Sequence, residues 1–235
     1  MRIREAIVLA GGRAERLGEA GGGRPKALVH VGELPLLAYQ LALLVRVGVD
    51  RLIVSCAAGQ GPLFEAELSG LGAEIVPVEE PEPLGRGGGL RFASTVRRDE
   101  GDVYALNGDE LVDLDLAALA EHHVAGGAAA TITVVPLESH LGIVDLDEDD
   151  VVLGFREKPR LPHWVSCGVY VLGEEALARL PERGDHETTT FPALAAERKL
   201  LAFRHEGLWL TVNTPKDLRA AAEHVAANPG WLGAA

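Results

Sequence analysis

The chain has 235 residues, 47% of them hydrophobic, and a formal net charge of −13 at pH 7. So acidic a protein lacks the basic face that nucleic-acid backbones require, which excludes DNA and RNA as expected partners. No apolar run approaches the roughly 18 residues of a membrane span, and the N-terminus has no apolar signal core, so we expect no membrane partner. The 2 cysteines lie in apolar runs, which predicts buried thiols and a cytoplasmic protein.

The first half of the chain alternates short apolar runs with helical segments. In chain order we predict a strand at residues 6–10, a helix at 35–47, strands at 52–56 and 74–78, a helix at 88–97, a strand at 103–106, a helix at 114–123 and a strand at 130–135. Strands that alternate with helices predict an α/β fold with a doubly wound, mostly parallel, Rossmann-like sheet. On such sheets ligands bind beyond the carboxyl ends of the strands.

The pattern changes after residue 136. Residues 143–146 and 151–155 flank an acidic turn and predict a β-hairpin, and a strand is expected at 164–172. We therefore expect a small antiparallel β insertion, placed to cover the open edge of the sheet. A helix at 191–198, a strand at 200–205 and a helix at 215–227 then return to a single domain spanning 1–235.

The first strand ends in Gly11 and Gly12, where the backbone can turn tightly and a ligand can approach closely. Two cations follow, Arg16 and Lys26, the second held by a stiff Arg-Pro-Lys step. The order of glycines and cations matches neither the dinucleotide fingerprint nor the Walker loop. It indicates a binding site for a nucleoside triphosphate. A glycine-rich surface turn with solvated arginines is the alternative.

Two polar side chains at strand ends are candidates to hold magnesium, which needs only one or two protein oxygens beside phosphates and water. Asp109 follows the strand at 103–106 within an Asn-Gly-Asp turn, and Asn213 follows a predicted strand that begins at Trp209. Helix capping is the alternative role for both side chains. The last helix has its own start signals, Thr214 as N-cap and Pro215 at the first helical position.

Two further segments carry candidate binding groups. Glu80 precedes a second glycine-rich stretch, residues 85–89, which we expect to form a loop where a flat base lies against the backbone. A carboxylate only accepts hydrogen bonds, so Glu80 matches the adjacent donors of guanine and favours GTP, unless it is a solvated acidic residue. Glu157 and Lys158 are suited to sugar hydroxyls and a sugar phosphate, with a surface ion pair as the alternative.

Taken together, these segments resemble the sugar-1-phosphate nucleotidylyltransferase family. The family patterns L-A-G-G-x-x-x-R-L, R-P-K, E-P-L-G-x-x-G, N-G-D, F-x-E-K-P, G-V-Y and W-x-x-x-x-T-P-x-x-L are similar to residues 9–17, 24–26, 82–88, 107–109, 155–159, 168–170 and 209–218. Within the family the chain looks most like the guanylyltransferases for mannose 1-phosphate and manno-heptose 1-phosphate. It departs from the family at Arg86, where a Thr is usual, and at Thr211, where many members carry a metal-binding Asp.

The resemblance implies that a sugar 1-phosphate attacks the α-phosphorus of a triphosphate and expels pyrophosphate. Arg16 would neutralise the β- and γ-phosphates, Lys26 would bridge the α-phosphate and the sugar phosphate, and Asp109 with Asn213 would hold Mg²⁺. The nucleotide half would be about 1–136, the sugar-phosphate half about 137–210 and the closing helix about 211–228. The implied nucleotide-binding positions are Leu9, Ala10, Gly11, Gly12, Glu80, Gly85, Asn107 and Gly108. The implied sugar-phosphate positions are Gly142, Glu157, Lys158, Ser166 and Gly168.

Alternatives to this reading remain open at this point. A uridylyl-, thymidylyl- or cytidylyltransferase that acts on another sugar 1-phosphate would share most of these motifs. A non-catalytic sensor or subunit that binds a sugar nucleotide would also keep the fold, and the absence of an acid at Thr211 favours it slightly. We expect a monomer or a homodimer.

Overall fold

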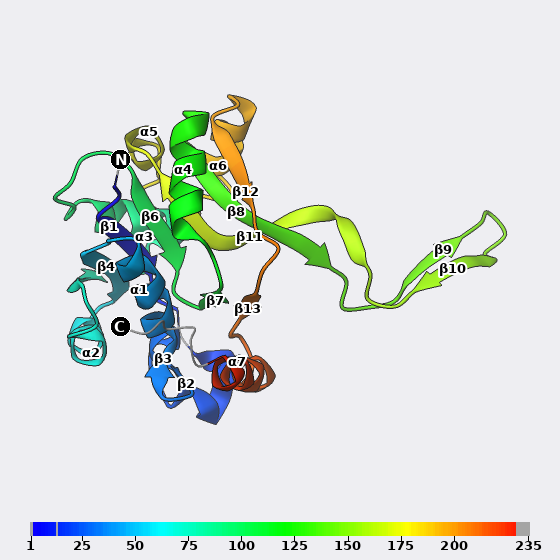
Figure 1. The fold of residues 1–235 in the computed structure, drawn as a ribbon, viewed down its shortest axis with the longest axis horizontal. Helices are drawn as coiled ribbons and strands as arrows, with labels where there is room; N and C mark the ends of the chain where they lie inside the picture. The colour runs from blue at the N-terminus through cyan, green and yellow to red at the C-terminus, as the bar shows by residue number, and fades with distance from the viewer. Residues whose placement is uncertain (1, 13, 229–235) are drawn as a thin grey trace.

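The computed structural model describes residues 2–12 and 14–228, which form an α/β fold around one seven-stranded sheet (Figure 1). The strand order is β12-β8-β11-β6-β1-β4-β5. All neighbours are parallel except β11, which runs antiparallel to both β6 and β8. The strands of this sheet are β1 (Glu5–Leu9), β4 (Arg51–Ala57), β5 (Glu74–Glu80), β6 (Val103–Asn107), β8 (Ala130–Glu138), β11 (Arg160–Leu172) and β12 (Leu200–Arg204). The predicted doubly wound, mostly parallel sheet is confirmed.

Helices cover both faces of the sheet because successive strand residues point to opposite sides. In β1, Ala6 and Val8 pack into one core cluster with α1, α2 and α4, while Ile7 packs into another with α3, α5 and α6. A third cluster joins the last helix, α7, to the segment between β1 and α1. The helices are α1 (Leu36–Arg46), α2 (Gly61–Leu68), α3 (Gly85–Ser94), α4 (Leu116–Gly126), α5 (Glu174–Ala178), α6 (Thr190–Ala196) and α7 (Pro215–Ala227). No helix among the described residues is both long and apolar enough to cross a membrane.

Short elements complete the carboxyl-end side of the sheet. The 3₁₀ turns η1 (Glu15–Gly21) and η2 (Lys26–Leu28) follow β1, and β2 (His30–Val31) pairs with β3 (Leu34–Pro35). After β6, the strand β7 (Glu110–Val112) pairs with β13 (Trp209–Thr211), which brings residues just before α7 beside the end of β6. Of these short elements only β13 was predicted, as the strand that leads into Asn213. The others were not, because two- and three-residue strands show no periodicity.

The start of α3 corrects the sequence prediction. We expected a glycine loop at 85–89 and a helix from 88, but the helix begins at Gly85 and includes these glycines. A Cβ on Gly87 would lie 2.7 Å from the backbone nitrogen of His186, and one on Gly88 would lie 2.7 Å from the carbonyl oxygen of Glu182. Glycine is therefore needed there for close packing against residues 181–186 rather than for contact with a base.

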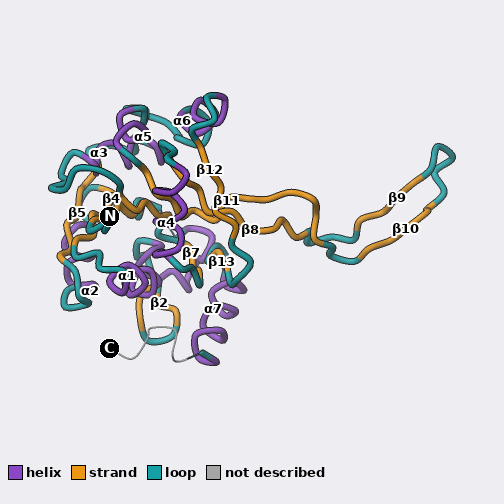
Figure 2. Tube along the Cα trace, turned by 45° about the horizontal axis from the view of Figure 1, so that its top comes forward, coloured by secondary structure: helices purple, strands orange, loops and turns teal. Residues whose placement is uncertain are grey.

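The predicted β-hairpin is present, but its position is not the one expected. Strands β8 and β11 continue past the edge of the body, and the chain between them forms β9 (Ile143–Leu146) and β10 (Val152–Arg156). This hairpin stands away from the sheet as an extended arm (Figures 1 and 2). It does not cover an open edge: the two edge strands of the sheet are β12 and β5.

Candidate active site

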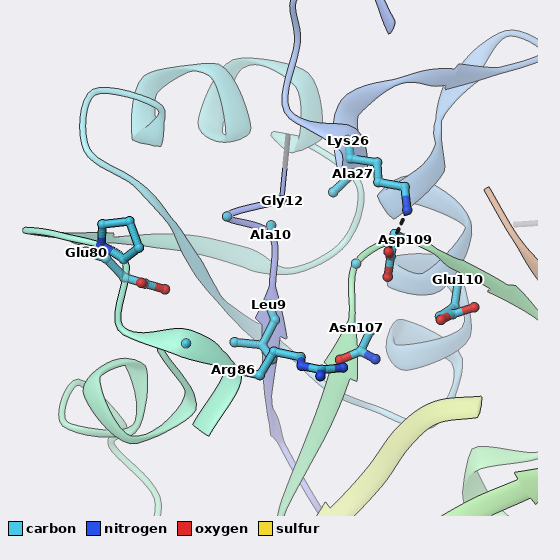
Figure 3. A pocket seen from close by; sticks show the side chains of 14 residues that line it. Leu9, Ala10, Gly12, Lys26, Ala27, Glu80, Arg86, Asn107, Asp109 and Glu110 are labelled. Atoms are coloured by element: carbon cyan, nitrogen blue, oxygen red, sulfur yellow. Dashed lines mark hydrogen bonds and ion pairs between the residues drawn. The ribbon is translucent and has the colours of Figure 1, made fainter. Parts of the chain in front are cut away.

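A cavity of about 370 Å³ opens at the carboxyl ends of β1 and β6 (Figure 3). It lies where the switch-point rule predicts a ligand site on a doubly wound sheet. The structure brings all eight sequence-predicted nucleotide positions to its lining. The lining consists of Leu9, Ala10, Gly11, Gly12, Lys26, Ala27, Glu80, Pro83, Gly85, Arg86, Asn107, Gly108, Asp109 and Glu110.

Backbone hydrogen bonds fix the floor of the cavity. The N–H of Ala10 donates to the carbonyl of Ser55, and the N–H of Gly108 donates to the carbonyl of Leu9, at 2.8 and 2.9 Å. A Cβ on Gly108 would lie 2.9 Å from that same Leu9 oxygen, so only glycine fits there. Gly12, by contrast, has nothing within 4 Å of its Cβ direction, which leaves open space for a ligand.

Three predicted site residues meet at one point beside the cavity. The Lys26 ammonium donates to Asp109 Oδ2 at 2.7 Å and to Asn213 Oδ1 at 2.6 Å. Arg16, which is exposed, lies with these three residues around an adjoining hollow of about 470 Å³. Side chains from η1, η2, the β6–β7 turn and the start of α7 therefore converge, although Lys26 and Asn213 alone are 187 positions apart in the chain.

The capping alternatives for Asp109 and Asn213 are excluded by the local structure. Asp109 is followed by β7, and the next helix is capped by Asp115, whose carboxylate accepts from the Ala118 N–H. Helix α7 is capped by Thr214 in a capping box with Asp217, as its start signals predicted. Both candidate metal ligands thus keep their side-chain oxygens for Lys26 and for the cavity.

Glu110 is a site residue that the sequence reasoning missed. Its buried carboxyl accepts a 2.8 Å hydrogen bond from the Trp209 indole. Burial, and then the negative charge of Asp109, raises its pKa to about 8. Thr211 is its direct cross-strand partner in the β7–β13 pair, so the position where many family members carry an acid lies opposite an acid here. In the sequence, the only indication of a role for Glu110 was its position directly after Asp109.

Gln40, on α1, was also missed, and it holds the turn that carries Asp109. Its amide donates to the carbonyl oxygens of Asn107 and Glu110 at 2.9 and 2.6 Å. No sequence pattern marked Gln40, because it lies in the middle of an otherwise apolar helix. The pair of bonds clamps both ends of the Asn-Gly-Asp turn to the body.

Glu80 faces the cavity but already has two protein partners. Its Oε1 accepts from the Ser55 hydroxyl at 2.7 Å and its Oε2 accepts from the Leu84 N–H at 2.9 Å. Each carboxylate oxygen has two lone pairs, so one acceptor site per oxygen is still available to a ligand. Arg86, the departure noted above, is also on the lining and is paired with Glu187 at 2.7 Å.

The predicted sugar-phosphate residues divide into two groups. Gly168 packs against Asn107, because a Cβ on it would lie 2.6 Å from Asn107 Nδ2, and Ser166 is two residues away on β11. Gly142, Glu157 and Lys158 lie instead at the base of the arm, outside both cavities. The Lys158 ammonium lies 3.9 Å from Glu157 Oε1, and each side chain is about two-thirds exposed. The structure does not bring these three to the cavity.

A doubly wound sheet with a glycine turn, a lysine and a carboxylate at its switch point defines an α/β nucleotide-binding protein. The model of the nucleotidyl transferase family matches residues 5–228, so the chain belongs to that family. It is 32% identical over 234 residues to a mannose-1-phosphate guanylyltransferase from Mycobacterium tuberculosis, covering 94% of this chain and 64% of that one. It is 31% identical over 228 residues to the Candida albicans mannose-1-phosphate guanyltransferase, covering 91% and 62%.

The curated relatives are longer proteins. The chain spans 60% of the catalytic subunit beta of the Drosophila pseudoobscura mannose-1-phosphate guanylyltransferase, at 30% identity and 90% coverage of this chain. Among solved structures, HddC from Yersinia pseudotuberculosis superposes with a TM-score of 0.73 at 23% identity, covering 94% of this chain and 99% of that one. HddC in complex with GMP-PN gives a TM-score of 0.72 at 22% identity, with the same coverage. These two structures support the fold.

Proposed function

We propose that this protein transfers a guanylyl group from GTP to a manno-configured sugar 1-phosphate, releasing pyrophosphate. The observation that carries the proposal is the meeting of Lys26, Asp109 and Asn213 beside the cavity that opens at Gly11 and Gly12. Support for the guanine base comes from the free acceptor sites of Glu80. The guanylyltransferase names of the relatives and the GMP-PN complex of HddC agree with it.

The residues present can perform this chemistry without a general base. A phosphate monoester loses its second proton near pH 6, so the attacking oxygen is already charged at neutral pH. The protein must instead bring anions together and hold them in line. Lys26 neutralises the reacting phosphates where they meet, and Arg16, exposed in the adjoining hollow, receives the departing pyrophosphate. The backbone at Gly11 and Gly12 lets the triphosphate approach closely.

The oxygens of Asp109 and Asn213 fit a magnesium ion. They converge on one cation, the Lys26 ammonium, and a carboxylate with an amide oxygen is a donor set that magnesium accepts. No group of three or more His, Cys, Asp or Glu suited to a metal lies among the described residues. Magnesium takes most of its ligands from phosphates and water, so two protein oxygens suffice. When bound, the ion supplies positive charge to the triphosphate.

Two of the five predicted sugar-phosphate residues lie near the cavity. Ser166 and Gly168, next to Asn107 on β11, are proposed to line the sugar-binding region. For Glu157 and Lys158 to bind the sugar phosphate as the resemblance implies, the base of the arm would have to move to the cavity. Their role stays a prediction.

The test is pyrophosphate release with magnesium, for GTP, ATP, UTP, dTTP and CTP, each against mannose, manno-heptose, glucose and N-acetylglucosamine 1-phosphates. We expect release only with GTP and one manno-configured sugar. Turnover with another base would keep the enzyme class and overturn the role of Glu80. Binding of a sugar nucleotide without magnesium-dependent turnover would favour the non-catalytic sensor instead.

A further inference from the structure

One wall of the cavity, built around Arg86, has no part in the phosphate chemistry. Arg86 and Asn107 both line the cavity, and in the view of Figure 3 both lie below Lys26. Two carboxylates of the loop between α5 and α6 bind Arg86. Glu187 Oε2 lies 2.7 Å from its Nη2, and Asp185 Oδ1 accepts from its backbone N–H at 2.9 Å. These contacts keep Glu187 beside the cavity although it comes much later in the chain.

Glu187 keeps one carboxylate oxygen available for a ligand. Its Oε2 pairs with Arg86, whereas the one partner of Oε1 among the described residues is the Tyr170 hydroxyl, at 3.5 Å. That distance is much longer than the usual O–H···O hydrogen bond of about 2.7 Å. The Glu187 side chain is 28% exposed, so a ligand can reach it. A charged oxygen without a short hydrogen bond is a strong acceptor for a hydroxyl group.

The neighbouring polar groups also lack close partners. Asn107 Oδ1 is buried and has no hydrogen-bond partner in the part of the chain that the structure describes. The Tyr170 hydroxyl lies 3.5 Å from Ser166 Oγ, as far as it lies from Glu187. A Cβ on Gly168 would lie 2.6 Å from Asn107 Nδ2, which places Asn107 beside the same stretch of β11. Because buried polar groups normally have partners, these atoms indicate a ligand with several hydrogen-bonding groups.

The charge of this wall selects the kind of ligand. Arg86 supplies one positive charge, and Asp185 and Glu187 supply two negative charges, so the wall is negative overall. It would repel a phosphate, whereas a neutral polyol can donate to the carboxylate and accept from the serine and tyrosine hydroxyls. The wall therefore suits the sugar ring of the acceptor, while Lys26 neutralises its phosphate.

We propose that Glu187 recognises the acceptor sugar by accepting a hydrogen bond from one ring hydroxyl through Oε1, and that Arg86 holds the carboxylate in the orientation this requires. The inference rests on the proposed function and deepens it, because it names the residue that selects the sugar. Glu187 takes the part that the resemblance gave to Glu157, which lies outside both cavities. It also explains Arg86, because a threonine at this position would leave the carboxylate without its cation.

The first experiment compares wild type with Glu187→Ala at varied concentrations of the preferred sugar 1-phosphate and of GTP. We expect kcat/KM for the sugar 1-phosphate to fall about 10- to 100-fold, the equivalent of one hydrogen bond to a charged group, with the KM for GTP unchanged. The control is Glu182→Ala, a carboxylate of the same loop whose side chain is 87% exposed, which should retain both constants. Thermal unfolding checks that the variants are folded. An unchanged kcat/KM for the sugar 1-phosphate in Glu187→Ala would overturn the inference.

A second measurement begins with the wild-type protein, so it does not depend on how a variant folds. Analogues of the sugar 1-phosphate that each lack one ring hydroxyl are compared with the parent compound. We expect one analogue to lose about 10- to 100-fold in kcat/KM with wild type, and Glu187→Ala to use that analogue and the parent equally well. Losses of the same size with both proteins for every analogue would contradict the contact between Glu187 and the sugar.

The variant Arg86→Met tests the positioning role. Alone it should lower kcat/KM for the sugar 1-phosphate. In the Glu187→Ala background it should have no further effect, because both residues act through one contact with the sugar. Equal effects in the two backgrounds would overturn the role of Arg86.

Failure of the proposed function gives a different result. If no pair of triphosphate and sugar 1-phosphate releases pyrophosphate, guanylyl transfer is overturned, and isothermal titration then compares the binding of GDP-mannose with that of GDP. Wild type should bind GDP-mannose more tightly than GDP, and Glu187→Ala should lose this difference. Equal binding of the two by wild type would overturn the role of Glu187 as well.

Discussion

The cavity and the arm are built from neighbouring strands, yet the cavity buries charged side chains whereas the arm exposes apolar ones. At the cavity, Lys26 is buried and held by two oxygens, and the turn carrying Asp109 is clamped by Gln40. On the arm, apolar side chains are exposed and the ion pairs, such as that between Arg156 and Asp145, are exposed as well. In the cavity, contacts within the chain hold each polar side chain in place, so its residues are sensitive to substitution. The arm leaves its apolar side chains exposed, so its residues should tolerate substitution better.

Removing a charge tests this contrast most strongly. Asp109→Ala or Lys26→Ala should lower turnover at least about 100-fold, or about 2.7 kcal/mol of barrier. Lys26→Ala removes a positive charge from the reacting phosphates, and Asp109→Ala removes the carboxylate that would hold the magnesium ion. Steady-state pyrophosphate release measures the loss, and thermal unfolding checks that the variants are folded. Asp99→Ala, an exposed aspartate in the loop after α3, is the control and should retain activity. An Asp109→Ala protein with near-normal turnover would refute the assigned role.

Adding a methyl group compares the packing of the two regions. Gly108→Ala places a Cβ 2.9 Å from the Leu9 carbonyl oxygen, and overpacking of this kind costs about 1–3 kcal/mol of unfolding free energy. Gly154→Ala on the arm meets only the end of the Asp145 side chain, at 3.0 Å, which can move aside. Urea unfolding should therefore show a large loss for the first variant and almost none for the second. Equal losses of unfolding free energy would show that the two regions do not differ in packing at these glycines.

A buried histidine makes the body sensitive to acid. His186 is fully buried against Tyr170 and Phe191, and desolvation lowers its pKa to about 4 from its ordinary value of 6.5. Between these values the unfolded chain binds a proton that the folded chain does not, so the unfolding free energy falls as pH falls. At pH 5 the cost is about 2 kcal/mol.

The matched variants are His186→Leu and, on the arm, His140→Leu. Urea unfolding at pH 7 and pH 5 should show that His186→Leu removes most of this acid sensitivity, while His140→Leu leaves it in place. An unchanged pH dependence in His186→Leu would mean that other groups cause the loss.

The smallest expected effect concerns the base. Glu80→Gln replaces one acceptor with a donor, so the preference for GTP over UTP should fall about tenfold, the equivalent of one hydrogen bond to a charged group. Ratios of kcat/KM for the two nucleotides measure it. Glu82→Gln, two residues along the same loop and 59% exposed, serves as the control. Unaltered selectivity in Glu80→Gln would remove Glu80 from base recognition.

The sequence was sufficient where local pattern and topology agree. The apolar run before Gly11, the capped helix α7 and the hairpin are local patterns, and all three are present. The meeting of Gly11 and Gly12 with the Asn-Gly-Asp turn followed from the rule that ligands bind beyond the carboxyl ends of the strands, and both segments line the cavity. Asn213 was a predicted magnesium ligand from its place at a strand end, but its contact with Lys26 was not predicted.

Tertiary packing decided the features that could not be predicted. The glycines of α3 look like a loop in sequence, and only the close approach of residues 181–186 explains them as a helix. Glu110 stood out only once β13 brought Trp209 to it. The direction of the arm depends on how far β8 and β11 pair beyond the body, and neither strand's composition reports that distance.

The ammonium of Lys26 joins positions 109 and 213, at separations of 83 and 187 residues. Closing so long a loop is entropically costly and slow, so local helices and strands can form well before this contact does. On a ribosome, the first 200 residues can be helical and paired while the lysine still lacks its last partner. We therefore expect a nascent chain, or one truncated before Asn213, to form most of the sheet but not the complete site. Such a chain should bind substrate poorly although it is largely folded.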